Sequence, residues 1–187
     1  MVKKASSSQK SQVSLREVTE GDLPVFFEHQ RDPDACRVAV FAARDHDAFT
    51  AHWAKILVDE SICAMTIVYD RRIAGNVVSW LQDDRRLVGY WIGKEYWGKS
   101  LATQALANFV RLDRQRPLYA HVALSNIASR RVLENCGFSI DEEWNELPVA
   151  PADGVEEVVM KLTTASPAAR QCVDSTAREA ELEEDFR

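Results

Sequence analysis

The strongest constraint on the fold is a run of three apolar stretches, rich in β-branched and aromatic residues, between residues 62 and 92. Charged triplets separate the stretches, and connections this short leave room only for hairpins. The sequence therefore predicts an antiparallel meander. The expected strands are Ile62–Tyr69, Ile73–Leu81 and Leu87–Ile92, with turns at Asp70-Arg71-Arg72 and Asp83-Asp84-Arg85.

A helix and a further strand follow the meander. Apolar residues recur at helical spacing over Ser100–Arg114, and Pro117–Ala123 has the composition of a short strand. Because a strand–helix–strand crossover joins parallel neighbours, the fourth and fifth strands should pair in parallel. A ligand is expected where their C-terminal ends meet helix N-termini.

The flanking segments complete the expected fold. We expect strands at Val13–Val18, Phe138–Trp144 and Val155–Leu162, helices starting near Asp22, Asp47 and Asn126, a left-handed C-cap at Gly137, and a polar, turn-like segment over residues 31–46. The predicted class is α/β (α+β): one mixed, mostly antiparallel sheet with helices on both faces and a parallel pair of strands four and five.

The domain is expected to span residues 13–162, between two tails. Residues 1–12 are rich in Ser, Lys and Gln, which predicts a flexible tail without the apolar stretch of a secretory signal. Residues 163–187 carry six acidic side chains against three arginines and few large apolar ones. This composition predicts an acidic tail that is disordered or loosely docked.

The cysteines and the charge balance narrow the possible partners. Cys36, Cys63, Cys136 and Cys172 show no C-x-x-C spacing, so free thiols in a reducing cytoplasm are expected, with no metal site. No apolar run is long enough to span a membrane. The 29 acidic residues exceed the 23 Lys and Arg, giving a net charge of −6. This balance argues against nucleic acid and favours amine substrates.

The segment Val88–Thr103, VGYWIGKEYWGKSLAT, leads from a strand through a short glycine-containing loop into a helix. Unpaired backbone N–H groups at a helix N-terminus bind anions such as phosphate. Gly98, Ser100 and Ala102 leave room for a close anion, and Lys99 adds a positive charge. The pattern indicates a phosphate-binding loop, and a tight turn without a ligand is the alternative interpretation.

A second segment, Ala123–Phe138, has the capping residues of a well-bounded helix. Together and at this spacing, GYWIGKEYWGKSLATQAL and NIASRRVLENCGF resemble two motifs of the GNAT N-acetyltransferase superfamily. They are most similar to the branch typified by ribosomal-protein-alanine N-acetyltransferases. The resemblance covers about residues 13–162 and implies a GNAT-like fold with acetyl-CoA as co-substrate.

The resemblance also implies roles for individual residues. Backbone amides of Trp97–Ala102 would hold the CoA pyrophosphate, and Tyr90–Ile92 would bind the pantetheine arm. An N–H there, at Ile92, would polarise the acetyl carbonyl. Asn126 would bind pantetheine, and Ser129 would protonate the leaving thiolate. The implied catalytic residues are Ser129 and Ile92, and the cofactor-binding set is Tyr90, Trp91, Ile92, Trp97, Gly98, Lys99, Ser100, Leu101, Ala102, Thr103, Asn126, Ser129 and Arg131.

The chain departs from the family's pattern at several positions. Trp97 stands where Gln or Arg is usual, as is common in this branch. Ser100 replaces the first motif glycine, which would narrow the loop and requires a negative φ. Leu133 occupies the position of a frequent thiolate-protonating Tyr, and Val88 that of a Glu common in this branch. No general base is evident, and the candidates, each with a structural interpretation as well, are Asp83, Asp84, Glu95, His46 and His121.

Residues 28–47, EHQRDPDACRVAVFAARDHD, lie where family members differ and are expected to contact the acceptor. Their mixed charges suit a wall that binds an amine beside a carboxylate, and equally an ordinary solvated loop with ion pairs.

The sequence therefore predicts acetyl transfer to a primary amine by direct attack in a ternary complex, in a monomer or homodimer. The acceptor is left open between a peptide or protein N-terminus and a small-molecule amine such as an aminoglycoside or polyamine. Cys63 and Cys136 are interpreted as core thiols rather than nucleophiles. The alternatives are an acyl-CoA-binding module with weak or no catalysis, and a scaffold acting through its tails.

Overall fold

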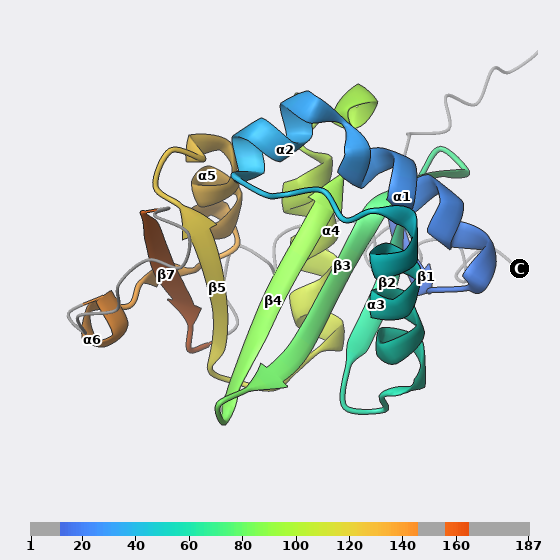
Figure 1. Cartoon of the computed structure of the whole chain (residues 1–187). Coiled ribbons are helices and arrows are strands. Elements are labelled where there is room, and N and C mark those ends of the chain that lie inside the picture. The colour runs from blue at the N-terminus through green and yellow to red at the C-terminus, as the bar shows by residue number, and fades with distance from the viewer. Residues whose placement is uncertain (1–11, 146–155, 165–187) are drawn as a thin grey trace, which may run out of the picture.

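The computed structural model describes residues 12–145 and 156–164, which form a seven-stranded sheet with the strand order β1-β2-β3-β4-β5-β7-β6 (Figure 1). Neighbouring strands are antiparallel except for the parallel pair β4 and β5, which confirms the predicted mixed sheet. The strands are β1 (Val13–Glu17), β2 (Cys63–Tyr69), β3 (Arg72–Gln82), β4 (Arg85–Ile92), β5 (Leu118–Ala123), β6 (Ser139–Ile140) and β7 (Glu157–Leu162).

Helices cover both faces of the sheet, as predicted. Figure 1 shows α1 and α3 on one face and α4 on the other. The helices are α1 (Leu23–Arg31), α2 (Pro33–Ala39), α3 (His46–Val58), α4 (Leu101–Leu112), α5 (Ile127–Asn135) and α6 (Glu142–Asn145), with short 3₁₀ turns η1 (Glu20–Asp22) and η2 (Lys94–Tyr96).

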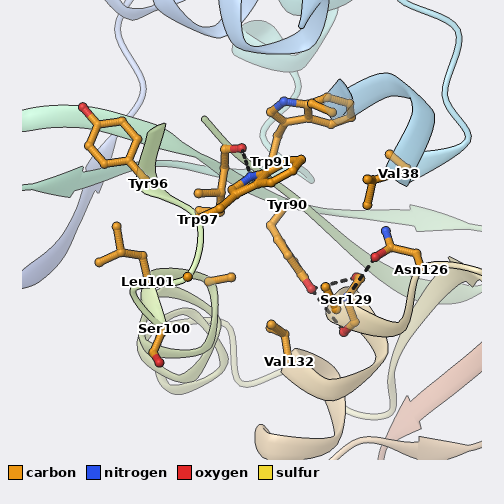
Figure 2. Close-up of a pocket in the computed structure, with 16 residues that line it drawn as sticks. Val38, Tyr90, Trp91, Tyr96, Trp97, Ser100, Leu101, Asn126, Ser129 and Val132 are labelled. Carbon is orange, nitrogen blue, oxygen red and sulfur yellow. Dashed lines mark hydrogen bonds between the residues drawn. The ribbon is translucent and has the colours of Figure 1, made fainter. Parts of the chain in front are cut away.

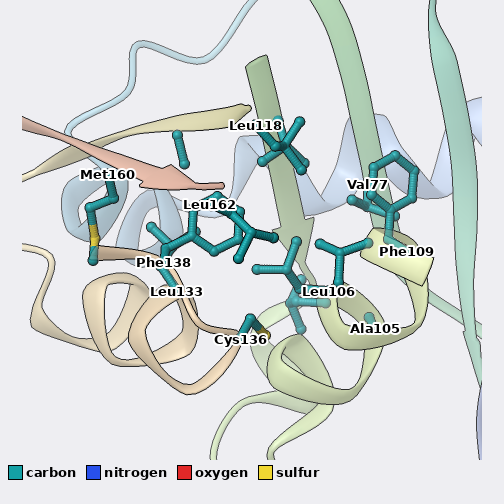
Figure 3. Packing of buried hydrophobic residues seen from close by; sticks show 14 of the residues in the cluster. Val77, Ala105, Leu106, Phe109, Leu118, Leu133, Cys136, Phe138, Met160 and Leu162 are labelled. Atoms are coloured by element: carbon teal, nitrogen blue, oxygen red, sulfur yellow. The ribbon is translucent and has the colours of Figure 1, made fainter. Parts of the chain in front are cut away.

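Alternation along the strands divides the core between the two faces. Val77 packs in the cluster that contains the α4 residues Leu106 and Phe109, whereas its neighbour Val78 packs with Phe26 and Trp53 under α1 and α3. Figure 3 shows the first cluster, in which the Phe109 side chain is fully buried. Two apolar layers therefore hold the sheet between the helices.

The two hairpin turns of the meander lie where they were predicted. Asp70 and Arg71, and likewise Asp83 and Asp84, take left-handed φ values between 48° and 62°. Two consecutive positive φ angles are typical of the tight turns that match the twist of paired strands. Asp83 and Asp84 are exposed in the turn between β3 and β4, so the structure gives them a turn role.

The prediction for residues 31–46 is wrong in part, because this segment contains α2. Asp32 caps that helix by accepting the N–H groups of Asp34 and Ala35, both at 2.9 Å, and Pro33 occupies the first helical position. An Asp-Pro pair is a strong helix-start signal. Its short length hid it among the turn-forming residues around it.

The predicted strand Phe138–Trp144 is also corrected. Only Ser139 and Ile140 pair with β7, after which Asp141 accepts the Trp144 N–H at 3.4 Å and α6 begins. A capping aspartate thus ends the strand early. The loop through Pro148, Pro151 and Gly154 lies outside the described residues, as do the predicted tails apart from residues 12, 163 and 164. Within the described ranges, no helix has the length and apolar character needed to cross a membrane.

Candidate active site

The site begins where β4 and β5 part. Their parallel pairing comprises Arg86 opposite Leu118 and Leu87 opposite Tyr119, at the N-terminal end of both strands. Toward their C-terminal ends the strands separate beneath α2 and α5 (Figure 1). A cavity of about 470 Å³ opens there, lined by β4, α2, α5 and the start of α4. This is the junction where the sequence predicted a ligand.

The end of β4 presents backbone N–H groups to this cavity. The Gly93 N–H donates to Ala74 O of β3 at 2.9 Å, and the Trp91 carbonyl also faces β3, so close that a Cβ on Gly75 would lie 1.9 Å from it. Because successive amides along a strand point to opposite edges, the Ile92 N–H faces the side from which β5 has separated. The Ile92 carbonyl already accepts the Trp97 indole N–H at 3.0 Å.

The start of α4 supplies a second set of unpaired donors. The first helical hydrogen bond runs from the Gln104 N–H to Ser100 O at 3.1 Å. The N–H groups of Leu101, Ala102 and Thr103 therefore have no partner within the helix. Gly98, just before them, has a φ of +73°, and no atom lies within 4 Å of where its Cβ would be. Such an open, left-handed loop before a helix start fits a pyrophosphate.

The backbone conformation of Ser100 differs from the one that the sequence predicted. Its φ is +57°, in the left-handed region, and not negative. This conformation costs an L-residue about 1–2 kcal/mol. Figure 2 shows its hydroxyl pointing away from Tyr90 and Ser129. The backbone keeps the glycine-like shape although the glycine is replaced.

The start of α5 forms the opposite wall. Asn126 is the N-cap of the helix, and its Oδ1 accepts the Ser129 N–H at 3.0 Å. The Ser129 hydroxyl lies 2.8 Å from the Tyr90 hydroxyl, a contact visible in Figure 2. Burial raises the pKa of Tyr90 to about 12. The phenol therefore stays protonated at neutral pH and can act as a hydrogen-bond donor.

Most of the predicted cofactor residues share this cavity. Lys99, Thr103 and Arg131 do not line it, and their assignment stays a prediction; Lys99 instead donates to Glu95 O at 3.0 Å. The predicted residues that line it are Tyr90, Trp91, Ile92, Trp97, Gly98, Ser100, Leu101, Ala102, Asn126 and Ser129.

Six lining residues were missed by the sequence analysis: Ala35, Val38, Ala39, Tyr96, Ala128 and Val132. The first three belong to α2, which was not predicted. Ala128 and Val132 lie one helical turn apart beside Ser129, so helical spacing from that residue points to them.

Neither Cys63 nor Cys136 is placed to act as a nucleophile at this site. Cys136 is buried in the core, its thiol donates to Thr103 O at 3.5 Å, and burial raises its pKa to about 12. Burial also raises the pKa of Cys63, which packs against the same core. Both cysteines are therefore the core thiols that were predicted.

The candidate bases lie away from the cavity lining. His121 is 3.4 Å from Glu157 and packs against Trp144, and His46 is exposed beside Asp47. Glu95 is also exposed but contacts His29, a buried residue that the sequence analysis missed, with 3.4 Å between His29 Nε2 and Glu95 Oε1. Among the described residues, no group of three or more His, Cys, Asp or Glu side chains is arranged to hold a metal ion.

A second cavity, of about 530 Å³, lies on the other face of β4. Its walls come from α1, α3 and the segment between α2 and α3, and its floor from β3 and β4. Tyr90 and Trp91 line both cavities. The two cavities therefore meet at Tyr90 and Trp91. The first cavity lies on the α4 and α5 side of the sheet and the second on the α1 and α3 side.

Comparisons with known proteins agree with this geometry. A family model described as an acetyltransferase (GNAT) domain matches residues 12–139. No curated protein gives a significant match.

Solved structures similar to this chain include three acetyltransferases. Spermidine N-acetyltransferase from Vibrio cholerae, in complex with CoA and spermine, superposes with a TM-score of 0.68 at 17% identity, covering 81% of this chain and 95% of that one. An acetyltransferase from Agrobacterium tumefaciens gives 0.66 at 17% identity, with 83% and 92% covered. One from Thermus thermophilus gives 0.64 at 18% identity, with 82% and 97% covered.

At these identities the structural similarity is one of fold, while the family model spans more than half of the sequence. The parted strands, the open helix start and the matched motifs lie in the same region of the chain. The protein belongs to the GNAT acetyltransferase family.

Proposed function

We propose that this protein is an acetyl-CoA-dependent N-acetyltransferase that acts on a primary amine by direct attack in a ternary complex. The observation that carries the proposal is the cavity between β4 and α5, which gathers the Ile92 N–H, the open start of α4 and the Tyr90–Ser129 pair. The chain's motifs resemble the ribosomal-protein-alanine branch, and the Vibrio cholerae neighbour is in complex with CoA and spermine.

The residues present fit acetyl-CoA. The unpaired N–H groups of Leu101, Ala102 and Thr103, with the helix dipole behind them, suit the pyrophosphate. The apolar side chains of Val38 and Val132 suit the pantetheine chain. The side-chain amide of Asn126 keeps its N–H donors for this chain, because its oxygen is used in the helix cap.

Acetyl-CoA would supply the acetyl group and a thiolate leaving group. The Ile92 N–H would donate to the acetyl oxygen as negative charge develops on it. One C–N bond forms and one C–S bond breaks; the amine's proton passes to water, and the thiolate takes a proton from Ser129. Tyr90 orients the Ser129 hydroxyl and replaces its proton, and solvent water returns a proton to Tyr90. The thiols play no covalent part.

The second cavity is the proposed acceptor side. It meets the first at Tyr90 and Trp91, so an amine held in it would approach the acetyl group from the face of β4 opposite the pantetheine. We also propose a cytoplasmic location, because the free thiols Cys36, Cys63 and Cys136 suit a reducing compartment.

Calorimetric titration with acetyl-CoA, followed by a free-thiol release assay on a panel of amines, tests the proposal. Ala102→Asp places a carboxylate at the helix start, where it suits the fold but repels a pyrophosphate. Gln104→Asp is the matched control, because residue 104 is exposed and outside the cavity. We expect wild type and Gln104→Asp to bind acetyl-CoA and Ala102→Asp to lose binding by at least 10-fold.

Equal binding by all three proteins, or no binding by any, would overturn the proposal. Binding without thiol release on every amine would instead favour the alternative of a catalytically weak or inactive acyl-CoA-binding module.

A further inference from the structure

The second cavity is built mainly of aromatic rings. Seven of its lining residues are Phe, Tyr or Trp, and they come from five separate parts of the chain. Such rings bury a large apolar area and pack best against a ligand that is itself aromatic or broadly apolar. These aromatic lining residues are Phe26, Phe41, Phe49, Trp53, Trp80, Tyr90 and Trp91.

The charged side chains that line this cavity are all positive among the described residues. Arg44 and Lys55 line it, and none of the described lining residues is Asp or Glu. Neither cation has an ion-pair partner within the described part of the chain; Arg44 lies 5.2 Å from the centre of the Phe41 ring. His52 also lines the cavity, and its pKa is lowered by burial and then by the charges of Arg44 and Lys55. The electrostatic potential in the cavity is therefore positive.

Other charges of the segment 28–47 are already paired elsewhere. Arg37 lies 2.7 Å from Asp34, which also contacts Lys94, and Arg31 lies 3.0 Å from Glu28. Asp45 caps α3 by accepting the Ala48 N–H at 2.8 Å. Arg44 is therefore the arginine of this segment whose charge is left for a ligand.

We infer that the second cavity binds acceptor amines that carry an aromatic group and a carboxylate, with Arg44 and Lys55 holding the carboxylate. This inference rests on the proposed function and names its substrate class. A guanidinium and a carboxylate form paired, charge-assisted hydrogen bonds. The aromatic group of the acceptor packs among the rings, as the cavity of about 530 Å³ allows.

The amine end of such an acceptor is directed to β4. Asn76 lines the cavity and lies directly opposite Trp91 in the β3–β4 register. No described residue hydrogen-bonds its side-chain amide, so its oxygen can accept from the acceptor's N–H. This places the nitrogen beside Tyr90 and Trp91, where the two cavities meet.

The same features disfavour a polyamine. A polyamine carries several positive charges and no anion, and here it would meet Arg44 and Lys55 without a carboxylate in the described lining to balance it. The structural neighbour in complex with spermine therefore shares the fold with this chain, while the cavity chemistry points to an acceptor of different charge.

The test uses the full-length protein with saturating acetyl-CoA and four acceptors: phenylalanine, phenylalaninamide, phenethylamine and spermidine. We expect kcat/KM for phenylalanine to exceed that for the amide by at least 10-fold. Arg44→Met should remove most of this preference by raising KM for phenylalanine, with little effect on the amide. Arg114→Met is the matched control, because Arg114 is exposed and lines neither cavity.

A further arm distinguishes a free amino acid from a chain terminus. It uses a C-terminally amidated peptide with an aromatic first residue and an acidic second residue, whose single carboxylate is a side chain. Faster transfer to this peptide than to phenylalanine identifies a peptide acceptor of the same chemistry. Equal use of acid and amide, or preference for spermidine, overturns the inference while leaving the acetyltransferase proposal intact.

A binding measurement covers the case in which no acceptor is turned over. NMR titration without acetyl-CoA compares 3-phenylpropionate with phenethylamine. Binding of the acid that Arg44→Met weakens supports the inference even then, whereas tighter binding of the amine overturns it. Failure of acetyl-CoA itself to bind counts against the proposed function and is detected separately by calorimetry.

Discussion

The Tyr90 hydroxyl lies 2.8 Å from the Ser129 hydroxyl and joins β4 to α5 across the opening between β4 and β5. Leu133, which stands at the family's frequent tyrosine position, is 1% exposed and belongs to the core. The phenol beside Ser129 therefore comes from β4 and not from α5. A hydroxyl pair across the opening is available for the proton that the leaving thiolate requires.

Removing either hydroxyl should lower turnover more than acetyl-CoA binding. We expect Ser129→Ala and Tyr90→Phe each to reduce kcat by about 10²-fold, the lower end for a lost proton donor. Because the two groups act through one contact, the double variant should lose little more than either single variant. Steady-state kinetics together with calorimetry of acetyl-CoA measures both quantities.

The matched control for this pair is Ser125→Ala, which removes an exposed hydroxyl close by that does not line the cavity. Full multiplication of the two single effects in the double variant would show that the hydroxyls act independently. Unchanged kcat in both single variants would exclude a proton-donor role for the pair.

Substitution can separate the helix cap that Asn126 forms from its proposed contact with acetyl-CoA. Asn126→Asp keeps the oxygen that caps α5 and loses the amide N–H donors, whereas Asn126→Ala loses both. We expect Asn126→Asp to weaken acetyl-CoA binding without loss of stability, and Asn126→Ala to cost about 1 kcal/mol of unfolding free energy as well. Thermal unfolding and calorimetry on the same samples separate these effects, and normal binding by Asn126→Asp would contradict the assignment.

The sequence predicts the meander and the β4–α4–β5 crossover because these depend on local periodicity and short turns. Ser100 shows the limit of such reasoning, since its φ is set by the loop that precedes α4 and not by its own preference. The second cavity could not be predicted, because Arg44, Lys55 and Asn76 lie far apart in the chain and meet only when α3 packs over β3. Among the charged residues of 28–47, composition alone does not separate Arg44 from Arg31 and Arg37.

Ser100→Gly tests whether the loop before α4 keeps its left-handed conformation when a glycine stands at residue 100. Glycine relieves the left-handed strain of about 1–2 kcal/mol, but its extra freedom in the unfolded chain offsets about 0.4–1 kcal/mol of that gain. We expect unchanged or slightly higher stability and unchanged acetyl-CoA binding. Ser100→Val should lower both, because this φ is strained for a β-branched residue; normal stability and binding in the valine variant would contradict the glycine-like loop.

Asp22 should make folding sensitive to acid. Burial alone would raise its pKa, but hydrogen bonds from Arg16, Thr19 and Thr66 outweigh burial and hold the pKa well below its usual range. A lowered folded-state pKa contributes stability that is fully present above the unfolded pKa of about 3.9 and is lost as pH falls from there through the folded pKa. Asp22→Asn should lose about 1–3 kcal/mol at pH 7 and show a shallower acid dependence than wild type.

Urea unfolding between pH 2 and pH 7 measures this effect. Glu60→Gln, an exposed carboxylate, is the matched control and should follow the wild-type pH curve. The same acid dependence in Asp22→Asn as in wild type would show that other carboxylates dominate.

His52 gives a direct measure of the field in the second cavity. Burial, and then the charges of Arg44 and Lys55, lowers its pKa, so the imidazole is neutral at pH 7. NMR titration should find its pKa below the value of about 6.5 for an unperturbed histidine, and Lys55→Met should raise it. Because the folded pKa is lowered, the contribution of His52 to stability is constant above about pH 6.5 and declines as pH falls below that value. Phenylalanine bound near these cations should also raise the pKa of His52, because its carboxylate offsets their charge. A downward shift of this pKa on binding would contradict the carboxylate assignment.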